Sequence, residues 1–210
     1  TFLLFILALC SIALFAQNED WFWAKQAGGT SDDYGNSIAI DANGNSYVTG
    51  SFLGSATFGT TTLTSSGSED IFVAKLDING NWLWAKQAGG TTYNDYVYGI
   101  AVDTNGNSYI TGSFLGSATF GTTTLTSSGS EDIFVAKLDI NGNWLWAKQA
   151  GGTNGDDCYG IAIDTNDNSY VTGIFSESAT FGTTTLTSSG YYDIFVAKID
   201  HNGNWLWAKQ

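Results

Sequence analysis

Six segments of the chain have a composition that could bind calcium. Each has the pattern Asp-x-Asn-(Gly or Asp)-Asn, which offers carboxylate and amide oxygens at alternating positions, as calcium loops do. The six begin at Asp41, Asp77, Asp103, Asp139, Asp164 and Asp200. An EF-hand loop also needs a distal bidentate Glu, which does not follow here. Asn-Gly between β-rich runs predicts a type I′ hairpin turn, in which both central residues have positive φ. We therefore expect plain turns and no cofactor, with calcium at these turns as the alternative.

Acidic and tyrosine side chains gather where otherwise near-identical segments of the chain differ. They lie after the Gly-Gly-Thr segments and in a longer connection further along. The candidate binding residues are Asp32, Asp33, Tyr34, Tyr93, Asp95, Tyr96, Asp156, Asp157, Tyr159, Glu177, Tyr191 and Tyr192. Binding residues are often found on loops of a rigid scaffold, and this mixture suits a polar surface ligand, either a carbohydrate or a protein. The alternative is neutral drift in exposed loops.

The sequence predicts a non-catalytic protein. It has a single His, His201, and no nucleophile–base pair, metal-ligand cluster or phosphate-binding Gly loop. Cys158 stands where the equivalent segments have Gly35 and Val97, which suits a small space-filling residue. A glycosidase would need a unique pair of carboxylates, whereas most acids here recur in every segment. The alternative is an extracellular glycan-active enzyme whose catalytic residues lie outside this sequence.

The charge balance argues against a nucleic-acid partner. The net charge is −13, with seven Lys and no Arg. Every Lys follows an Ala in a repeated motif, so the positive charges are spaced along the chain instead of clustered. Binding of a nucleic acid requires a basic footprint, which this sequence lacks.

The chain begins with an apolar run over residues 2–15. It is shorter than the roughly 20 residues that span a bilayer, and it predicts the core of a signal peptide whose basic start is missing, cleaved after Ala16. A lipoprotein signal at Cys10 is disfavoured because the bulky Leu9 precedes it. We therefore expect an exported protein, extracellular or on the outer cell surface, with no transmembrane segment in the mature chain.

The rest of the chain is a repeat of about 62 residues. Residues 49–91 and 111–153 are identical, and a third copy follows with few changes. The predicted organisation is a signal peptide (1–16), the terminal strand of a preceding or closing unit (17–29), and three repeats, the last truncated at its end. The repeats cover residues 30–91, 92–153 and 154–210.

Each repeat is expected to form four main strands, with a possible short extra hairpin between Ser55 and Ser68. Alternation within the third strand places Phe72 and Leu76 on one face and Ile71 on the other. A sheet that is apolar on both faces must be covered on both, as in a radial stack of small sheets. Gly50 is expected to leave room for a ring from the next unit. A parallel β-helix is the rival fold, but it lacks two Asn-Gly hairpins per coil.

A pair of Trp residues recurs in the last strand of each unit, as at Trp82 and Trp84. Because Trp buries a large apolar area, we expect these rings to pack between units. The alternative is that they are exposed platforms on which sugars stack.

Three strings of residues resemble a known family. They are Gly-Asn-Ser-Tyr-Val-Thr-Gly-Ser-Phe at 44–52, Asp-Ile-Phe-Val-Ala-Lys-Leu-Asp from Asp70, and Asn-Gly-Asn-Trp-Leu-Trp-Ala-Lys-Gln from Asn79. They are similar to the bacterial SBBP (seven-bladed β-propeller) repeats of secreted and surface proteins, over residues 21–210. The resemblance implies an all-β, propeller-type array of four-stranded antiparallel blades, of which three full units form an incomplete ring. It also implies an extracellular address, and the family has no established activity or catalytic residues to carry over. Our own hypothesis for the function is a non-catalytic binding, adhesion or display scaffold.

Overall fold

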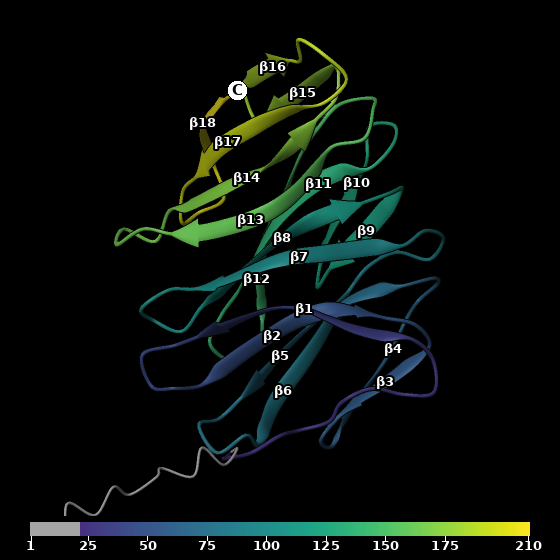
Figure 1. The fold of residues 1–210 in the computed structure, drawn as a ribbon, viewed down its shortest axis with the longest axis vertical. Helices are drawn as coiled ribbons and strands as arrows, with labels where there is room; N and C mark the ends of the chain where they lie inside the picture. Colours follow the sequence, from purple (N-terminus) through teal and green to yellow (C-terminus); the bar gives the residue numbers. More distant parts are fainter. Residues whose placement is uncertain (1–21) are drawn as a thin grey trace, which may run out of the picture.

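The computed structural model describes residues 22–210, and this part of the chain is built of strands (Figure 1). The predicted signal peptide at 1–16 lies outside the described residues. Within 22–210 there is no helix long and apolar enough to cross a membrane.

Three four-stranded antiparallel sheets form the array, one in each predicted repeat. Blade 1 contains β1 (Asp33–Ile40), β2 (Ser46–Phe52), β5 (Asp70–Leu76) and β6 (Trp82–Ala88). Blade 2 contains β7 (Asp95–Val102), β8 (Ser108–Phe114), β11 (Asp132–Leu138) and β12 (Trp144–Ala150). Blade 3 contains β13 (Asp157–Ile163), β14 (Ser169–Phe175), β17 (Asp193–Ile199) and β18 (Trp205–Lys209). These antiparallel hairpins rule out the β-helix and confirm the propeller-type array, without a closed ring in the described residues.

A short hairpin is inserted between the second and third strands of each blade, at the place where a possible extra hairpin was predicted. The hairpins are β3 (Ser55–Phe58) with β4 (Thr61–Thr64), β9 (Ser117–Phe120) with β10 (Thr123–Thr126), and β15 (Ser178–Phe181) with β16 (Thr184–Thr187). Each hairpin also pairs with the end of the preceding outer strand, as at the bridge between Gly89 and Thr119. The hairpins therefore tie successive blades together at their outer edges.

The inner strands β1, β7 and β13 lie side by side along the array (Figure 1). Each contains a bulge, which in β1 falls between Gly35 and Ser37. At this bulge the Asn36 side chain donates a hydrogen bond to Val97 O of the next blade at 2.8 Å. The bulge also brings Tyr34 O close to Gly50, where a Cβ would lie 1.7 Å from that oxygen and 2.8 Å from the Phe72 ring. The expectation for Gly50 is therefore wrong, because the ring comes from the same blade.

The six Asp-x-Asn turns are hairpin loops, but they are not type I′ turns. In the first, the Asp41 N–H donates to Asn45 O and the Gly44 N–H donates to Asp41 O, both at 3.0 Å. Only Gly44 has a positive φ (79°), and Asn43 does not. The loop is a type I turn followed by a left-handed residue. The Asp41 carboxylate selects it by accepting the N–H groups of Asn43 and Asn45 at 2.9 Å.

Alternation along the third strand builds the core between blades, as predicted. On β5, Phe72 and Ala74 pack within blade 1, whereas Ile71 and Val73 pack against blade 2. All four side chains are buried. Each blade thus presents one apolar face to its own hairpin and the other to the following blade, which is why the repeat must stack.

Candidate ligand-binding face

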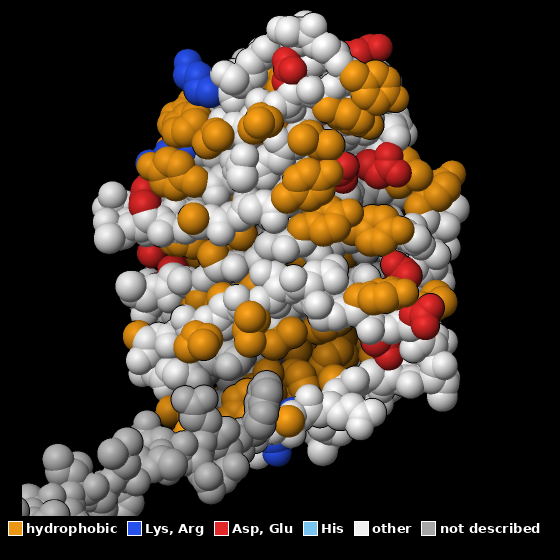
Figure 2. Space-filling model, in the orientation of Figure 1, with side chains coloured by type: hydrophobic (Ala, Val, Ile, Leu, Met, Phe, Trp, Pro, Cys, Tyr) orange, Lys and Arg blue, Asp and Glu red, His pale blue; other side chains and the backbone are white. Residues whose placement is uncertain are grey.

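Two sides of the array differ in chemistry. The Asp-x-Asn turns join β1 to β2 and β5 to β6, so they lie on one side of blade 1, while the inserted hairpin and the loop to β7 lie on the other. The same holds in the other blades. This second side, called the loop face, carries the segments that differ between units. Acidic side chains gather along it, at the right margin of the space-filling view (Figure 2).

A polar hollow on the loop face lies between blades 2 and 3 and has a volume of about 360 Å³. It is called the second groove, because a smaller one, the first groove, lies between blades 1 and 2. The second groove is lined by Ser130, Glu131, Asn154, Gly155, Ser176, Glu177, Gly190, Tyr191 and Tyr192. The rings of Tyr191 and Tyr192 meet edge to face, with centroids 4.8 Å apart. The lining offers carboxylates, amide and hydroxyl groups and aromatic faces, which together can hydrogen-bond and stack on a polyhydroxylated ligand.

Two pairs of positions at which blade 3 departs from the other two units lie together in this groove. Units 1 and 2 have Leu-Gly and Ser-Glu where unit 3 has Ser176-Glu177 and Tyr191-Tyr192. These two pairs are separated along the chain, and the fold brings both to the lining of one hollow. Of the predicted site residues, Glu177, Tyr191 and Tyr192 are therefore brought together.

Glu177 has an unusual backbone conformation. Its φ is 55°, and the equivalent residues are Gly54 and Gly116 with φ of 73° and 75°. A side chain in this left-handed region costs free energy, because Cβ crowds the backbone. Strain of this kind concentrates at functional sites, here at the edge of the second groove.

Replacing Glu177 with Gly is expected to raise the free energy of unfolding by about 1 kcal/mol, because Gly adopts this φ without the Cβ penalty. Chemical denaturation measures the change. Glu177→Ala is the matched control, since it keeps Cβ and should give no such gain. Equal stabilisation by both substitutions would show that the charge, and not the backbone, is responsible.

A first groove of about 330 Å³ lies between blades 1 and 2. Its lining is Ser68, Thr92, Tyr93, Asn94, Tyr96, Leu115 and Glu131. The Asn94 amide donates to the Tyr96 hydroxyl at 2.6 Å. Glu131 lines both grooves, but the sequence did not identify it as a candidate. Unit 1 has the same residue, Glu69, at the equivalent position. Comparison of the units therefore does not single out Glu131, and only its contacts with blade 3 show that it belongs to a groove.

The inner strands add a tyrosine cluster beside the grooves. Tyr98 stacks on Tyr96 at 6.2 Å and meets Tyr159 edge to face at 5.3 Å. The Tyr159 hydroxyl donates to the Asp157 carboxylate at 3.2 Å. Burial and the neighbouring Asp157 charge raise the pKa of Tyr159 to about 12. Tyr98 was also absent from the predicted binding residues. Comparison of the units could have identified it, because unit 1 has Asn36 at the equivalent position.

Two candidate residues do not reach the surface. Asp95 and Asp156 are buried, and their carboxylates accept the N–H groups of Gly90 and Gly152 at 2.7 and 2.8 Å. They hold the turn after each Gly-Gly pair, so they position the loop face and do not line it. The prediction that Asp95 and Asp156 are binding residues is therefore wrong, because their carboxylates are buried against the backbone.

The candidates of the first unit lie apart from both grooves. Asp33 accepts the Gly29 N–H at 2.7 Å and, with Tyr34, lines an apolar hollow on blade 1. Asp32 is exposed, and its charge raises the pKa of Tyr34. The structure therefore separates these three residues from the second groove.

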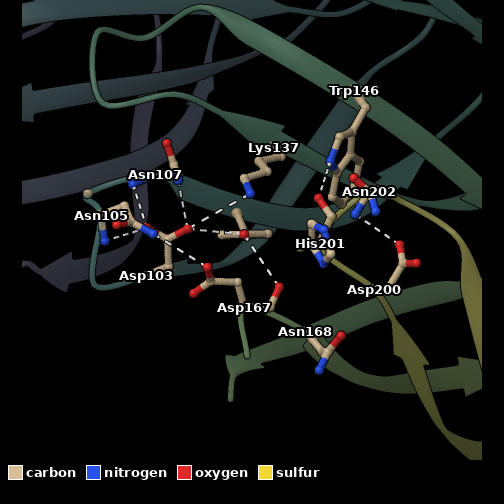
Figure 3. A network of polar contacts seen from close by, with 12 residues as sticks. Asp103, Asn105, Asn107, Lys137, Trp146, Asp167, Asn168, Asp200, His201 and Asn202 are labelled. Carbon is tan, nitrogen blue, oxygen red and sulfur yellow. Dashed lines mark hydrogen bonds and ion pairs between the residues drawn. The ribbon is translucent and has the colours of Figure 1, made fainter. Parts of the chain in front are cut away.

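The opposite side of the array joins the blades through a repeated polar network (Figure 3). Asp103 accepts hydrogen bonds from Asn107 and from the Tyr109 hydroxyl, and Lys137 Nζ lies 3.9 Å from its carboxylate. Trp146 Nε1 donates to His201 O of blade 3 at 3.1 Å. Equivalent Asp–Lys pairs recur within the other two blades, and the Trp hydrogen bond recurs between blades 1 and 2. The Trp side chains therefore connect successive blades on this side.

The turn carboxylates are occupied by protein donors. Both oxygens of Asp77 accept hydrogen bonds, from the N–H groups of Asn79 and Asn81 and from the Asn81 amide. Hydrogen bonds from Asn81 lower the pKa of Asp77. In residues 22–210 no group of three or more His, Cys, Asp or Glu side chains is arranged to hold a metal. A structural role for these carboxylates is the simpler interpretation.

Removal of calcium therefore tests the turns directly. We expect the thermal unfolding midpoint to be the same with and without a chelator, because backbone and amide donors already satisfy the carboxylates. Differential scanning calorimetry in chelator and in excess calcium measures it. A midpoint that falls in chelator and recovers on adding calcium would instead establish calcium sites.

The Trp pairs pack at the joints but are only half-buried. Trp82 meets Phe58 of the inserted hairpin edge to face at 5.3 Å, and Trp84 Nε1 donates to Ile140 O of the next blade at 3.1 Å. Trp84 also packs on Tyr47, with ring centroids 6.0 Å apart. The expectation of packing between units is confirmed for Trp84, although both rings are only half-buried, which is less than expected.

Cys158 is a buried space-filling residue, as predicted. Its side chain packs in the core between blades 2 and 3, near Val171. Burial raises the pKa of its thiol to about 12. A thiol that is neutral and enclosed at neutral pH does not act as a nucleophile.

Comparison with known proteins agrees with this architecture. The SBBP family model, described as "Beta-propeller repeat", matches residues 23–51, 83–113 and 145–173. The second and third matches start in the outer strands β6 and β12, and the first starts in the segment before β1. Each match then runs through an inner strand into the strand beside it. Fold and matches together define a repeat protein of the β-propeller class. Each of its three repeat matches is to the SBBP repeat model.

A distant relative is an uncharacterized WD repeat-containing protein of Acanthamoeba polyphaga mimivirus. It is 27% identical to this chain over 223 residues. The match covers 88% of this chain and 16% of the relative, so the chain spans about a sixth of that protein's length. Both comparisons indicate a repeat scaffold.

Proposed function

We propose that this chain is a non-catalytic, exported scaffold that binds a polyhydroxylated ligand of the carbohydrate class in the second groove. The observation that carries the proposal is convergence. Two pairs of substitutions, distant in sequence and confined to blade 3, line a single hollow. Drift in exposed loops would scatter such changes over the loop face. Among described residues, the only His, His201, lies in a turn on the opposite side, which favours binding over catalysis.

The ligand class follows from the chemistry of the lining. Glu131 and Glu177 supply acceptors, Asn154 supplies a donor and an acceptor, and the Tyr191–Tyr192 pair supplies aromatic faces. Hydroxyl groups of a sugar can donate to the carboxylates and accept from the amide. The apolar faces of a sugar ring can stack on a tyrosine, which is both apolar and hydrogen-bonding.

Affinity electrophoresis through native gels that contain soluble polysaccharides tests this function. We expect at least one polysaccharide to retard the wild-type chain and Tyr192→Ala to weaken retardation about tenfold, a loss of about 1.4 kcal/mol. Tyr34→Ala is the matched control, because Tyr34 and Tyr192 are similarly exposed (49% and 47%) and Tyr34 lies outside the groove. Lack of retardation by every polysaccharide, or equal effects of both variants, would contradict the proposal.

Export rests on the apolar run at 2–15 and has its own test. When the chain is expressed with a basic segment added before the apolar run, protein recovered outside the cytoplasm should begin at Gln17, as measured by mass spectrometry of its N-terminal peptide. An intact apolar run on protein that stays in the cytoplasm would contradict export.

A further inference from the structure

The fold holds an ammonium group three times with the same two partners, a carboxylate and a tyrosine ring. In blade 2, Lys137 Nζ lies 3.9 Å from the Asp103 carboxylate (Figure 3) and 4.6 Å from the centre of the Tyr109 ring. The corresponding Lys75 and Lys198 make the same two contacts in blades 1 and 3. An aromatic face attracts a cation through its quadrupole, and the carboxylate supplies the opposite charge. A carboxylate beside a tyrosine is therefore an arrangement in which the chain itself binds ammonium.

The second groove offers the same two partners without an ammonium group of the protein. Glu131 and Glu177 supply two carboxylates, and the rings of Tyr191 and Tyr192 meet edge to face at 4.8 Å. Among the described residues that line the groove, none is Lys or His, and the chain contains no Arg. The lining thus carries negative charge that a positively charged ligand can neutralise.

Gly155 keeps a space open between one carboxylate and one tyrosine of this groove. A Cβ placed on Gly155 would lie 3.5 Å from Glu131 Oε2 and 4.0 Å from the Tyr192 hydroxyl, so both groups face the same point. The residue of unit 2 that is equivalent to Gly155 is Asn94. In the first groove the Asn94 amide occupies this place and donates to the Tyr96 hydroxyl at 2.6 Å. The second groove therefore leaves room for a ligand group where the first groove holds an N–H donor of the protein.

Negative charge also acts on the tyrosine cluster beside the groove. Burial raises the pKa of Tyr98, and the charges of Asp157 and Glu131 raise it further. These two carboxylates place a negative potential at this part of the loop face, and such a potential attracts a cationic ligand from solution.

We propose that the ligand of the second groove is an amino sugar whose ammonium group lies between Glu131 and Tyr192. This ligand class rests on the proposed function and narrows it from carbohydrates in general to those with free amino groups, such as oligomers of glucosamine. The ammonium donates to the Glu131 carboxylate and lies against the Tyr192 ring, as Lys137 does with its own two partners. The hydroxyl groups of the same sugar bind Asn154 in the lining.

Isothermal titration calorimetry with three matched ligands tests the amino sugar. The first is a glucosamine oligomer, and the second is the N-acetylated oligomer of the same length, which has sugar hydroxyls without the charge. The third is a lysine peptide with the same number of ammonium groups and no sugar. The titrations are made at about 0.15 M salt, which screens attraction between distant exposed charges. We expect the glucosamine oligomer to bind at least about tenfold more tightly than the other two, because it alone offers both the sugar and hydrogen bonds from a charged group.

Variants separate the groove from the general negative charge of the chain. Glu131→Gln keeps an oxygen that can accept from Ser130 Oγ, and it should weaken binding of the glucosamine oligomer about tenfold and remove the preference over the N-acetylated one. Glu177→Gln, at an exposed position, should weaken binding less. Glu69→Gln is the matched control and should leave binding unchanged. Glu69 is the equivalent of Glu131 in blade 1, is half-buried like it, and lies outside the second groove.

The outcomes distinguish the amino sugar from the broader proposal. Equal affinity for the two oligomers, with Tyr192→Ala weakening both, would overturn the amino sugar and leave the proposed function standing. A lysine peptide that binds as tightly as the glucosamine oligomer, or equal effects of Glu69→Gln and Glu131→Gln, would show attraction by charge alone and would also overturn it. So would a glucosamine oligomer that does not bind. Failure of the proposed function itself is seen separately, as a lack of retardation by every polysaccharide.

Discussion

Replacing Phe134 with alanine is expected to lower the free energy of unfolding by about 3–5 kcal/mol, the range for deletion of a buried aromatic ring. Phe134 is fully buried on β11 in the middle blade. Its ring packs against Phe120 of the inserted hairpin, with centroids 4.9 Å apart, and against the backbone at Gly112. Deleting the ring leaves a cavity between strand, hairpin and neighbouring blade, which rigid sheets cannot fill by collapsing.

Urea denaturation followed by tryptophan fluorescence measures this loss. Phe22→Ala is the matched control, because the Phe22 ring is fully exposed and its removal should change stability by less than about 0.5 kcal/mol. A loss below about 1 kcal/mol for Phe134→Ala would mean that the inserted hairpin does not pack on the blade as described.

The buried carboxylate of Asp95 is expected to make the array less stable as the pH rises. Burial raises the pKa of Asp95 to about 7, the Gly90 N–H acts in the opposite direction, and the Asp70 carboxylate adds to the rise. The unfolded chain has an ordinary Asp, with a pKa near 3.8. Between these two values the folded state binds the additional proton, so stability falls as the pH increases through this window and levels off above it.

Asp95→Asn removes this dependence. The carboxamide keeps an oxygen that can accept the Gly90 N–H and has no charge to bury. The variant should be more stable than wild type by up to about 4 kcal/mol at pH 8, with the difference vanishing near pH 4, since each pKa unit corresponds to about 1.4 kcal/mol. Denaturant titrations of both proteins from pH 4 to pH 8 measure the difference.

Asp77→Asn is the contrasting control for this pH series. The hydrogen bonds from Asn81 lower the pKa of Asp77, so its ionised form stabilises the fold above the unfolded pKa and this contribution is lost as the pH falls. Its variant should therefore not gain stability at pH 8. A difference between wild type and Asp95→Asn that is constant with pH would contradict the buried, protonated state of Asp95.

Much of the architecture was predictable because the same pattern of apolar, polar and turn residues recurs in all three units. The alternation of Phe72 with Ile71 and Val73 gave the two buried faces of each blade. The Asn-Gly pairs predicted where the hairpin turns lie but not their turn type. The turns are type I with a left-handed Gly or Asp instead of type I′, because an Asp carboxylate accepts two backbone N–H groups within the turn. The Asn-Gly pair alone does not reveal this contact.

The candidate site was only partly predictable, because its grooves form between units. Departures from the repeat identified Glu177 and Tyr192, since they differ from the residues at equivalent positions. The same comparison could not find Glu131, which is unchanged from unit 1 and becomes part of a groove only through its neighbours in blade 3. It also included Asp95, because a sequence does not reveal that a loop carboxylate turns inward to hold Gly90.

The central claim is that four departures of blade 3 from the repeat, Ser176, Glu177, Tyr191 and Tyr192, make a binding groove on the repeated scaffold. The most direct test restores the sequence of unit 2 at four positions, with Ser176→Leu, Glu177→Gly, Tyr191→Ser and Tyr192→Glu in one chain. Because unit 2 already folds with these residues, we predict that the free energy of unfolding is kept or raised while retardation by the bound polysaccharide is abolished. Unchanged retardation in the restored, folded chain would contradict the claim.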